Sequence, residues 1–299
     1  MRYLDPKADL TFKKVFGEHP DLVISLLNAL LPFDTPEERI ASIEYLPVEM
    51  VPETPFKKNS IVDVRCRDER GRTFLVEMQM LWSSAFMQRV LFNASKAYVR
   101  QLGSGKKYEF LQPVYSLSLV NDIFLPDLPT YYHDYRIVEM EHTDKVIEGL
   151  RFIFVELPKF TPQTFSEKKM HVLWLRYLTE IDDQTRTIPQ ELLDNPEINK
   201  AVQQLEESAF SDAQLWGYDD FWDAVRVEKT LVSDAERKGM ARGMEKGMEK
   251  GMEKGMEKGM EKGKKAALLS TAAKMRAKGM DMATICELTG LSPDDLHRE

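Results

Sequence analysis

The stretch "SIVDVRCRDERGRTFLVEMQM", residues 60–80, predicts a β-hairpin. Two runs rich in β-branched and apolar residues flank the polar segment "RDERGR", which holds one glycine. A three-residue loop over residues 69–71, with Gly71 in the left-handed conformation, is a common hairpin connection. This loop would pair Asp68 with Arg72, and that pair sets the register of both strands.

The two faces of the hairpin differ in character, because strand side chains alternate between faces. The even-numbered positions are apolar and predict the core face: Val62, Val64, Cys66, Phe74, Val76, Met78 and Met80. The odd-numbered positions include Asp63, Arg65, Glu77 and Gln79, together with Ile61, Leu75 and Leu81. A slip of one residue would set a core face against a polar face, so burial favours the odd-length loop.

The predicted register places Asp63 directly opposite Glu77, with Cβ atoms about 4.5–5.5 Å apart. Two like charges at that distance destabilise a sheet. Protonation of one carboxyl group would relieve the repulsion, and so would a bound divalent cation such as Mg²⁺, which prefers oxygen ligands. The alternative is a polar face on which both carboxylates point into water. The apolar residues Ile61, Leu75 and Leu81 favour a face that is partly covered.

Helical and strand patterns alternate on both sides of the hairpin. Helical spacing of apolar residues occupies residues 21–33, 83–105, 168–181 and 199–210, and buried-strand patterns occupy residues 113–124 and 151–160. Pro32 should end the first of these helices, and Ser83 or Ser84 should cap the second. The sequence therefore predicts an α/β domain over residues 1–230, with a mixed sheet flanked by helices.

Charge is distributed unevenly along the 299 residues, whose formal net charge is -8. Residues 1–110 carry 16 Lys and Arg against 15 Asp and Glu, residues 111–230 carry 11 against 22, and residues 231–299 carry 14 against 12. The acidity therefore lies in the middle of the chain. The segment that contains the hairpin is nearly neutral with local basic clusters, and such clusters can contact phosphates.

Several classes of protein and site are disfavoured by the composition. With only two cysteines, Cys66 and Cys286, a disulfide framework and a cysteine-rich zinc site are excluded. The five histidines have no metal-binding spacing, and neither a Gly-rich phosphate loop before a helix nor a serine nucleophile elbow occurs. No apolar run reaches the ~20 residues of a membrane span, and the N-terminal segment lacks the apolar core of a secretory signal. We expect a cytoplasmic protein that does not contact membranes.

The composition changes abruptly after the α/β domain. The unit "GMEK" occurs five times in succession within residues 243–263, and we expect residues 231–264 to form a helical linker. Glycine at every fourth position costs about 1 kcal/mol per residue relative to alanine, so this helix is marginal by itself. It could be a solvated spacer. It could also be a helix–helix contact, with methionine as the apolar stripe and glycine allowing close approach.

The last segment, residues 265–299, predicts a small helical hairpin that resembles a helix-turn-helix. Gly290 would form the turn, and Ser292 and Pro293 would begin the second helix. A helix that reads DNA bases needs basic or amide side chains near its start, but this one offers Asp294 and Asp295. The composition favours a protein-contact hairpin over DNA readout.

The chain resembles a known nuclease family. The resemblance rests on these stretches: "LDPKADLTFKKVFG", "KKNSIVDVRC", "FLVEMQM", "FMQRVLFNASKAYVRQLGSGKKYEFLQPVYSLSLV" and "FIFVELPKF". In this order, with an aspartate, thirteen intervening residues and Glu-x-Gln across a hairpin, they are similar to the PD-(D/E)XK nuclease superfamily. The closer resemblance is to its Rpn (recombination-promoting nuclease) or putative transposase branch, over about residues 1–225.

The resemblance implies a PD-(D/E)XK nuclease fold and Mg²⁺-dependent cleavage of DNA. By position, Asp63, Glu77 and the backbone carbonyl of Met78 would hold the cation. Gln79 stands where the superfamily usually has a lysine, and a glutamine can orient water or a phosphate oxygen but brings no positive charge.

The missing positive charge has three candidate sources. Lys58 precedes the first strand, Arg89 lies on the following predicted helix, and Lys13 lies near the N-terminus. Each would contact DNA phosphates, although an ordinary surface role is the alternative for all three. Asp9 could supply the further acidic residue that many members of the superfamily carry on the first helix. Tyr98 is better explained by packing.

Three functions are consistent with these observations. The first is a Mg²⁺-dependent DNA endonuclease acting in recombination, in a transposase-like reaction or in defence against foreign DNA. The second is a DNA-binding or assembly protein that keeps the nuclease fold without turnover, which Gln79 and the acidic middle segment favour. The third is a homo-oligomeric scaffold organised through the repeat helix.

Overall fold

The computed structural model describes residues 2–33, 35–50, 60–103, 105, 107–162 and 169–296. The chain divides into two compact units, Met1–Lys229 and Thr230–Glu299. A single helix, α7 (Asp212–Ala277), begins in the first unit and continues through both expected domain boundaries. The division of the second unit into a linker and a separate hairpin stays a proposal.

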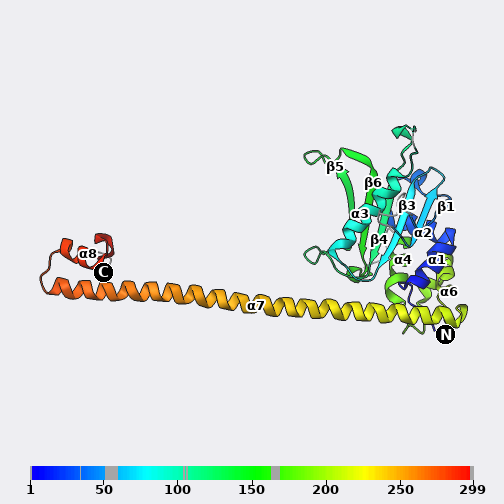
Figure 1. Cartoon of the computed structure of the whole chain (residues 1–299). Coiled ribbons are helices and arrows are strands. Elements are labelled where there is room, and N and C mark those ends of the chain that lie inside the picture. The colour runs from blue at the N-terminus through cyan, green and yellow to red at the C-terminus, as the bar shows by residue number, and fades with distance from the viewer. Residues whose placement is uncertain are drawn as a thin grey trace. The chain divides into compact units, whose positions relative to one another are not determined.

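The first unit contains one sheet and several helices (Figure 1). Its strands are β1 (Ile43–Tyr45), β2 (Val64–Asp68), β3 (Thr73–Gln79), β4 (Val114–Val120), β5 (Tyr132–Val138) and β6 (Val146–Glu156). Its α-helices are α1 (Asp9–Glu18), α2 (Pro20–Leu30), α3 (Ser84–Val99), α4 (Lys169–Glu180), α5 (Gln190–Leu193), α6 (Pro196–Gln203) and the first turns of α7. Short 3-10 helices occupy Pro36–Glu38, Tyr108–Phe110, Leu157–Lys159 and Glu207–Ala209.

The sheet has the strand order β1-β2-β3-β4-β6-β5. Strands β3, β4 and β6 run parallel in its centre, whereas β1, β2 and β5 pair antiparallel with their neighbours. Helix α3 connects β3 to β4, as a parallel pair requires. The predicted mixed sheet with flanking helices is therefore confirmed. The sequence patterns predicted neither β1 nor β5, which are the two edge strands.

The hairpin of β2 and β3 has the predicted register. Val64 pairs with Val76 and Arg67 with Thr73, so the same count brings Asp63, one residue before β2, opposite Glu77. Gly71 closes the loop with φ +83°. A Cβ atom at Gly71 would also lie 3.3 Å from Cγ of Gln112, so both the backbone and the space favour glycine.

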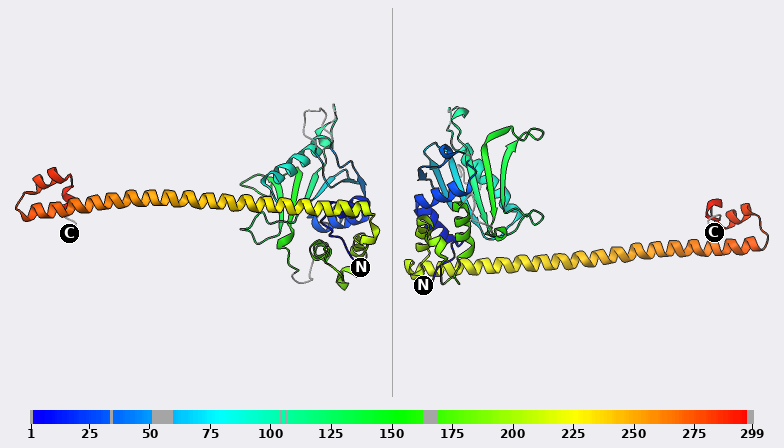
Figure 2. Two further views of the ribbon diagram at one scale, coloured as in Figure 1. Left: turned by 60° about the horizontal axis from the view of Figure 1, so that its bottom comes forward. Right: turned by 180° about the vertical axis from the view of Figure 1, so that it is seen from behind.

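Helices cover both faces of the sheet (Figures 1 and 2). Four residues of the even-numbered face, Val64, Cys66, Phe74 and Val76, join the main core formed with α1, α2, α4 and α6, which includes Phe16, Leu26 and Trp174. Val62, which was also expected on that face, instead packs with Leu75 in the cluster under α3, so the strict alternation fails at the entrance to β2. Helix α3 covers the opposite face, where Leu75 packs against Ala94 and Ala97.

The interpretation of a solvated odd-numbered face is therefore wrong. Leu75 is fully buried and Glu77 is only 4% exposed. The apolar frame is nevertheless not the predicted one, because Ile61 is 59% exposed. The cover comes from α3, a helix about ten residues further along the chain.

The N-terminal segment is tied to α4 and to the first turns of α7 by buried polar contacts. The N–H of Asp5 donates to Tyr218 Oη at 2.8 Å. Lys7 Nζ lies 2.9 Å from Asp5 Oδ1 and donates to the carbonyl of Leu178 at 3.0 Å. Asp5 is 5% exposed and Lys7 is 8% exposed, so this ion pair belongs to the interior of the first unit.

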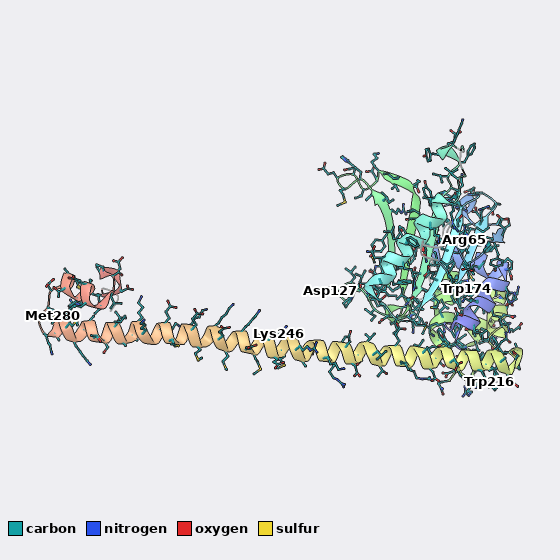
Figure 3. The ribbon with its side chains drawn as sticks, viewed as in Figure 1. Arg65, Asp127, Trp174, Trp216, Lys246 and Met280 are labelled. Atoms are coloured by element: carbon teal, nitrogen blue, oxygen red, sulfur yellow. The ribbon has the colours of Figure 1, made fainter. Side chains whose placement is uncertain are left out.

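In the second unit, α7 carries the repeats in one continuous helix with side chains standing out along it (Figure 3). The five repeat methionines between residues 244 and 260 are 64–75% exposed. Helices α8 (Met282–Thr289) and α9 (Pro293–Leu296) form the predicted helical turn, in which Gly290 has φ +70°. They pack on the end of α7 through Ala272, Ile285 and Leu291. Within the described ranges, none of the helices has the length and apolar character of a bilayer span.

Candidate active site

Asp63 lies at the entrance to β2, and its carboxylate turns toward β3. Its Oδ2 accepts a hydrogen bond from the backbone N–H of Met78 at 2.7 Å. Burial raises the pKa of Asp63 to about 6; the Met78 hydrogen bond opposes this effect, and the charge of Glu77 adds to it. The charge of Glu77 thus contributes to the raised pKa of Asp63, but less than burial does.

Glu77 is buried in the middle of the sheet beneath α3. Its Oε1 accepts a hydrogen bond from Asn93 Nδ2 at 3.0 Å, and its Oε2 lies 3.5 Å from Arg89 Nη2. Burial raises the pKa of Glu77, while Asn93 and Arg89 lower it by stabilising the anion. A carboxylate with one protein partner on each oxygen, beside a second carboxylate, is suited to share a cation with that neighbour.

Gln79 follows Glu77 on the same face of β3, and both of its amide atoms are engaged. Its Oε1 accepts from Arg89 Nη2 at 2.7 Å, and its Nε2 donates to the carbonyl of Leu81 at 2.6 Å. Arg89 therefore bridges Gln79 and Glu77, which brings a positive charge to the end of β3. Arg89 keeps 49% of its side chain exposed, so part of the guanidinium can still contact a ligand.

Helix α1 brings two further charged residues near Asp63. Lys13 lowers the pKa of Asp63 and Asp9 raises it, each less strongly than burial does. Lys13 Nζ and Asp9 Oδ1 form an ion pair at 2.6 Å, and both side chains are about half exposed. In the part of the chain that the structure describes, Asp9 makes no hydrogen bond to Asp63 or Glu77.

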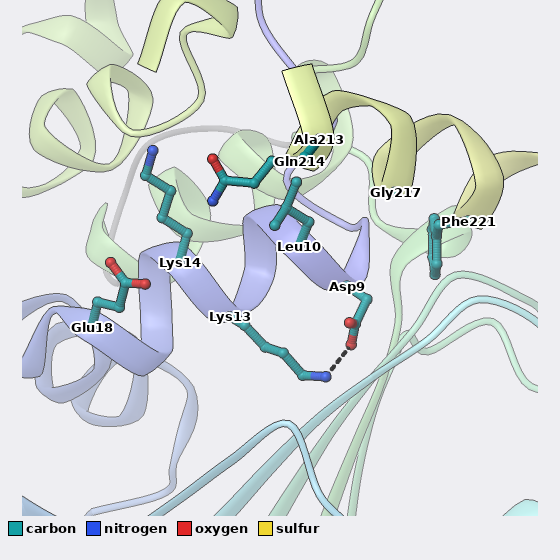
Figure 4. A pocket seen from close by; sticks show the side chains of 9 residues that line it. All are labelled: Asp9, Leu10, Lys13, Lys14, Glu18, Ala213, Gln214, Gly217 and Phe221. Carbon is teal, nitrogen blue, oxygen red and sulfur yellow. Dashed lines mark ion pairs between the residues drawn. The ribbon is translucent and has the colours of Figure 1, made fainter. Parts of the chain in front are cut away.

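A pocket of about 500 Å³ opens beside α1, next to the first turns of α7 (Figure 4). Its lining residues are Asp9, Leu10, Lys13, Lys14, Glu18, Ala213, Gln214, Gly217 and Phe221. Asp9 and Lys13 belong both to this pocket and to the electrostatic surroundings of Asp63. The pocket therefore places two basic side chains, Lys13 and Lys14, on the surface of α1 near Asp63, although neither Asp63 nor Glu77 lines it.

Three further residues were considered for the site, and the structure places two of them. Met78 is partly buried, and its N–H is the donor to Asp63. Tyr98 packs against the cluster around Leu75, and its ring lies beside Gly149, which agrees with a packing role. Lys58 lies outside the described residues.

Sequence reasoning missed Asn93, although a signal for it was present. The buried stripe of α3 runs through Phe86, Val90, Asn93 and Ala97, in which the asparagine is the polar exception. A polar residue within an apolar helix face requires a buried partner. Asn93 is 1% exposed and has two partners, Glu77 and Ser60.

The donor set fits a hard cation. Asp63 and Glu77 offer carboxylate oxygens and Met78 offers a carbonyl, while Mg²⁺ commonly uses one or two carboxylates and completes its shell with water. No group of three or more His, Cys, Asp or Glu side chains suited to a metal occurs among the residues described, so a cation held here would need water for its remaining ligands. Ser118 on β4 pairs with Glu77, and its buried hydroxyl has no hydrogen-bond partner within the described ranges.

One comparison with known proteins identifies a family. Residues 6–235 match a family model described as "PD-(D/E)XK nuclease family transposase". This match covers the sheet, its flanking helices and the first turns of α7. No curated protein and no solved structure matched the chain.

Proposed function

The chain belongs to the PD-(D/E)XK nuclease family of transposases, and we propose that it is an endonuclease that hydrolyses DNA phosphodiester bonds with a divalent cation, Mg²⁺. The observation that supports the proposal is the Asp63–Glu77 pair: the register of β2 and β3, continued by one residue, sets Asp63 opposite Glu77, and burial raises the pKa of both carboxyl groups. Such a pair is unfavourable without a cation or a proton. We infer a role in DNA recombination or transposition from the family alone.

We assign Asp63, Glu77 and the carbonyl of Met78 as the groups that hold the cation. When bound, the cation would lower the pKa of a water molecule and offset the charge that develops on the phosphate. Met78 orients Asp63 through its N–H, so the same residue supports one ligand and offers another. Asp63 must lose its proton before it can serve, which its pKa of about 6 allows near neutral pH.

Arg89 takes the electrostatic role that a lysine usually has in this superfamily. Gln79 holds the guanidinium through its Oε1, so the pair Gln79–Arg89 presents a positive charge from α3 beside the carboxylates. A guanidinium stays charged at every relevant pH and donates several hydrogen bonds to a phosphate. We propose that Arg89 stabilises the charge on the scissile phosphate and that Gln79 orients it.

The DNA backbone would approach over the surface between α1 and the end of β3. Lys13 contributes an exposed ammonium group there, held by Asp9 until a phosphate competes for it. Lys58 stays a proposed phosphate contact, and its position lies outside the described residues. Contacts of this kind give affinity without sequence specificity.

The experiment is a plasmid-nicking assay in the presence of Mg²⁺, with EDTA as the metal-free control. The wild type should nick the plasmid, and both Asp63→Ala and Glu77→Ala should lose at least about 100-fold in rate, since either change removes a proposed metal ligand. Ile61→Ala is a matched control, because Ile61 neighbours Asp63 but is exposed. Nicking that persists in both carboxylate variants would refute the assignment.

The alternative is a catalytically weak or inactive DNA-binding or assembly protein that retains the nuclease fold. Gln79 in place of a lysine and the acidic segment 111–230 are the observations that favour it. In this case DNA binding would be insensitive to EDTA, and no nicking would occur with Mg²⁺ or Mn²⁺. Nicking and DNA binding of the wild type, each measured with Mg²⁺ and with EDTA, therefore separate the two functions.

A further inference from the structure

We propose that Asn93 is a positioning residue, which holds the carboxylate of Glu77 in the orientation needed to bind the cation. This inference rests on the proposed function, because it concerns the same metal site. Asn93 touches neither the substrate nor the cation in this proposal. Its effect passes through Glu77.

The amide of Asn93 is fixed from both ends. Its Nδ2 donates to Glu77 Oε1 at 3.0 Å, and its Oδ1 accepts from the hydroxyl of Ser60 at 2.6 Å. A flipped amide would place its oxygen against the Glu77 carboxylate, where two acceptors would repel each other. The two partners therefore select one orientation of the amide, and that orientation presents a donor to Glu77.

Burial strengthens the preference for this orientation of the Asn93 amide. Asn93 is 1% exposed, Ser60 is 4% exposed and Glu77 is 4% exposed, so bulk water does not readily replace a lost partner. A buried carboxylate oxygen that loses its donor is left with a desolvation penalty. Such a carboxylate turns toward another donor, and that turn takes it out of the orientation in which it would bind the cation.

Ser60 ties Asn93 to the segment that carries the other carboxylate. Ser60 lies three residues before Asp63 on the segment that leads into β2, whereas Glu77 lies on β3. Asn93 therefore links the two segments that carry the proposed ligands, from a helix that belongs to neither. Arg89, one helical turn earlier, faces the other oxygen of Glu77, so α3 holds Oε1 and Oε2 with separate side chains.

The test measures Mn²⁺ affinity of the full chain by isothermal titration calorimetry, without DNA, so that turnover does not enter. Asn93→Leu has nearly the same shape but no donor. We expect its affinity for Mn²⁺ to fall by about 10-fold, the usual effect of removing a hydrogen bond that orients a metal ligand. Ser60→Ala leaves the donor to Glu77 in place and should weaken binding less.

Val90→Ala is the matched control for lost packing. Val90 lies on the same buried stripe of α3 and packs against Phe86, Val120 and Phe154. We expect this variant to lower the unfolding temperature while its Mn²⁺ affinity stays within about 2-fold of the wild type. If Asn93→Leu is not folded at the measuring temperature, the Mn²⁺ affinity of Ser60→Ala is compared with that of Val90→Ala. A weaker affinity of Ser60→Ala then supports the positioning role, and an equal affinity overturns it.

The outcomes separate the two proposals. If the wild type binds Mn²⁺, Asp63→Asn does not, and Asn93→Leu or Ser60→Ala binds more weakly than Val90→Ala, the positioning role is supported. Equal affinity of Asn93→Leu, Ser60→Ala and Val90→Ala would overturn that role and leave the metal site intact. If the wild type itself binds no Mn²⁺, the metal site is refuted, and the role of Asn93 falls with it.

Discussion

The Nη2 atom of Arg89 lies 2.7 Å from Oε1 of Gln79. This contact joins α3 to the end of β3 and brings the guanidinium within 3.5 Å of Glu77. A glutamine where a lysine is usual removes a positive charge from the strand, and the neighbouring helix supplies one in its place. The substitution therefore does not by itself indicate an inactive enzyme.

The first prediction concerns this charge. Arg89→Ala should reduce plasmid nicking by about 10- to 100-fold, because the proposed electrostatic contact of Arg89 with the scissile phosphate would be lost. Arg89→Lys should keep part of the activity, since the charge remains but the geometry of the guanidinium does not. Arg67→Ala, which removes a basic side chain paired with Glu44 on the surface, should leave nicking unchanged. Equal rates for Arg89→Ala and the wild type would contradict the assignment.

The second prediction concerns the cost of ionising Asp63. Burial raises its pKa from 3.8 to about 6, so the folded state holds the proton more tightly than the unfolded state. The stabilising contribution of this group is complete below pH 3.8 and is lost as the pH rises through about 6. The difference corresponds to about 3 kcal/mol of unfolding free energy at most.

Asp63→Asn stays neutral at every pH and still offers an oxygen to the N–H of Met78. In metal-free buffer this variant should be more stable than the wild type at pH 8 and close to it at pH 4. Urea unfolding at the two pH values measures the difference. A variant whose advantage is the same at pH 4 and pH 8 would show that Asp63 has an ordinary pKa.

The third prediction concerns metal addition. A cation that binds only the folded state stabilises it by an amount that grows with concentration, about 2.7 kcal/mol at 100 times the dissociation constant. Mg²⁺ at pH 7.5 should therefore raise the unfolding temperature of the wild type, measured by differential scanning fluorimetry. Asp63→Asn and Glu77→Gln should show no such rise. A shift of the same size in all three proteins would point to binding elsewhere.

The fourth prediction concerns the buried ion pair between Lys7 and Asp5. Lys7→Met leaves the Asp5 carboxylate buried without its partner, which typically costs about 3–5 kcal/mol. Burial already raises the pKa of Asp5, and Lys7 opposes that rise, so the variant should lose most stability at high pH. The double variant Asp5→Asn, Lys7→Met removes the uncompensated charge and should recover part of the loss. Guanidinium unfolding at pH 6 and pH 8.5 measures both.

The fifth prediction concerns the repeat helix. Successive methionines in a four-residue repeat turn by about 40° around a helix, so the stripe winds across much of the surface within five repeats. A straight partner helix could follow only part of such a stripe. We therefore expect a chain that stops after Val232 to keep the subunit number of the full chain in light scattering. A lower mass for the truncated chain would instead support assembly through the repeats.

The sequence by itself determined the local features of this protein. Alternation of apolar residues set the two faces of the hairpin, and Gly71 fixed an odd-length loop, so the register that opposes Asp63 and Glu77 followed from neighbours in the chain. The spacing of apolar residues likewise predicted the helices α2 and α3 and the strand β4. These features depend on backbone geometry and on burial patterns within about twenty residues, which is why the sequence suffices for them.

Only the tertiary structure decided what surrounds the carboxylates. No local pattern could show that α3 crosses the odd-numbered face, that Arg89 and Asn93 divide the two oxygens of Glu77, or that Ser60 completes the contact. The edge strands β1 and β5 also escaped prediction. The physical reason is the same in each case: partners distant in the chain meet through packing, and burial gives a polar side chain its role only once those partners are in place.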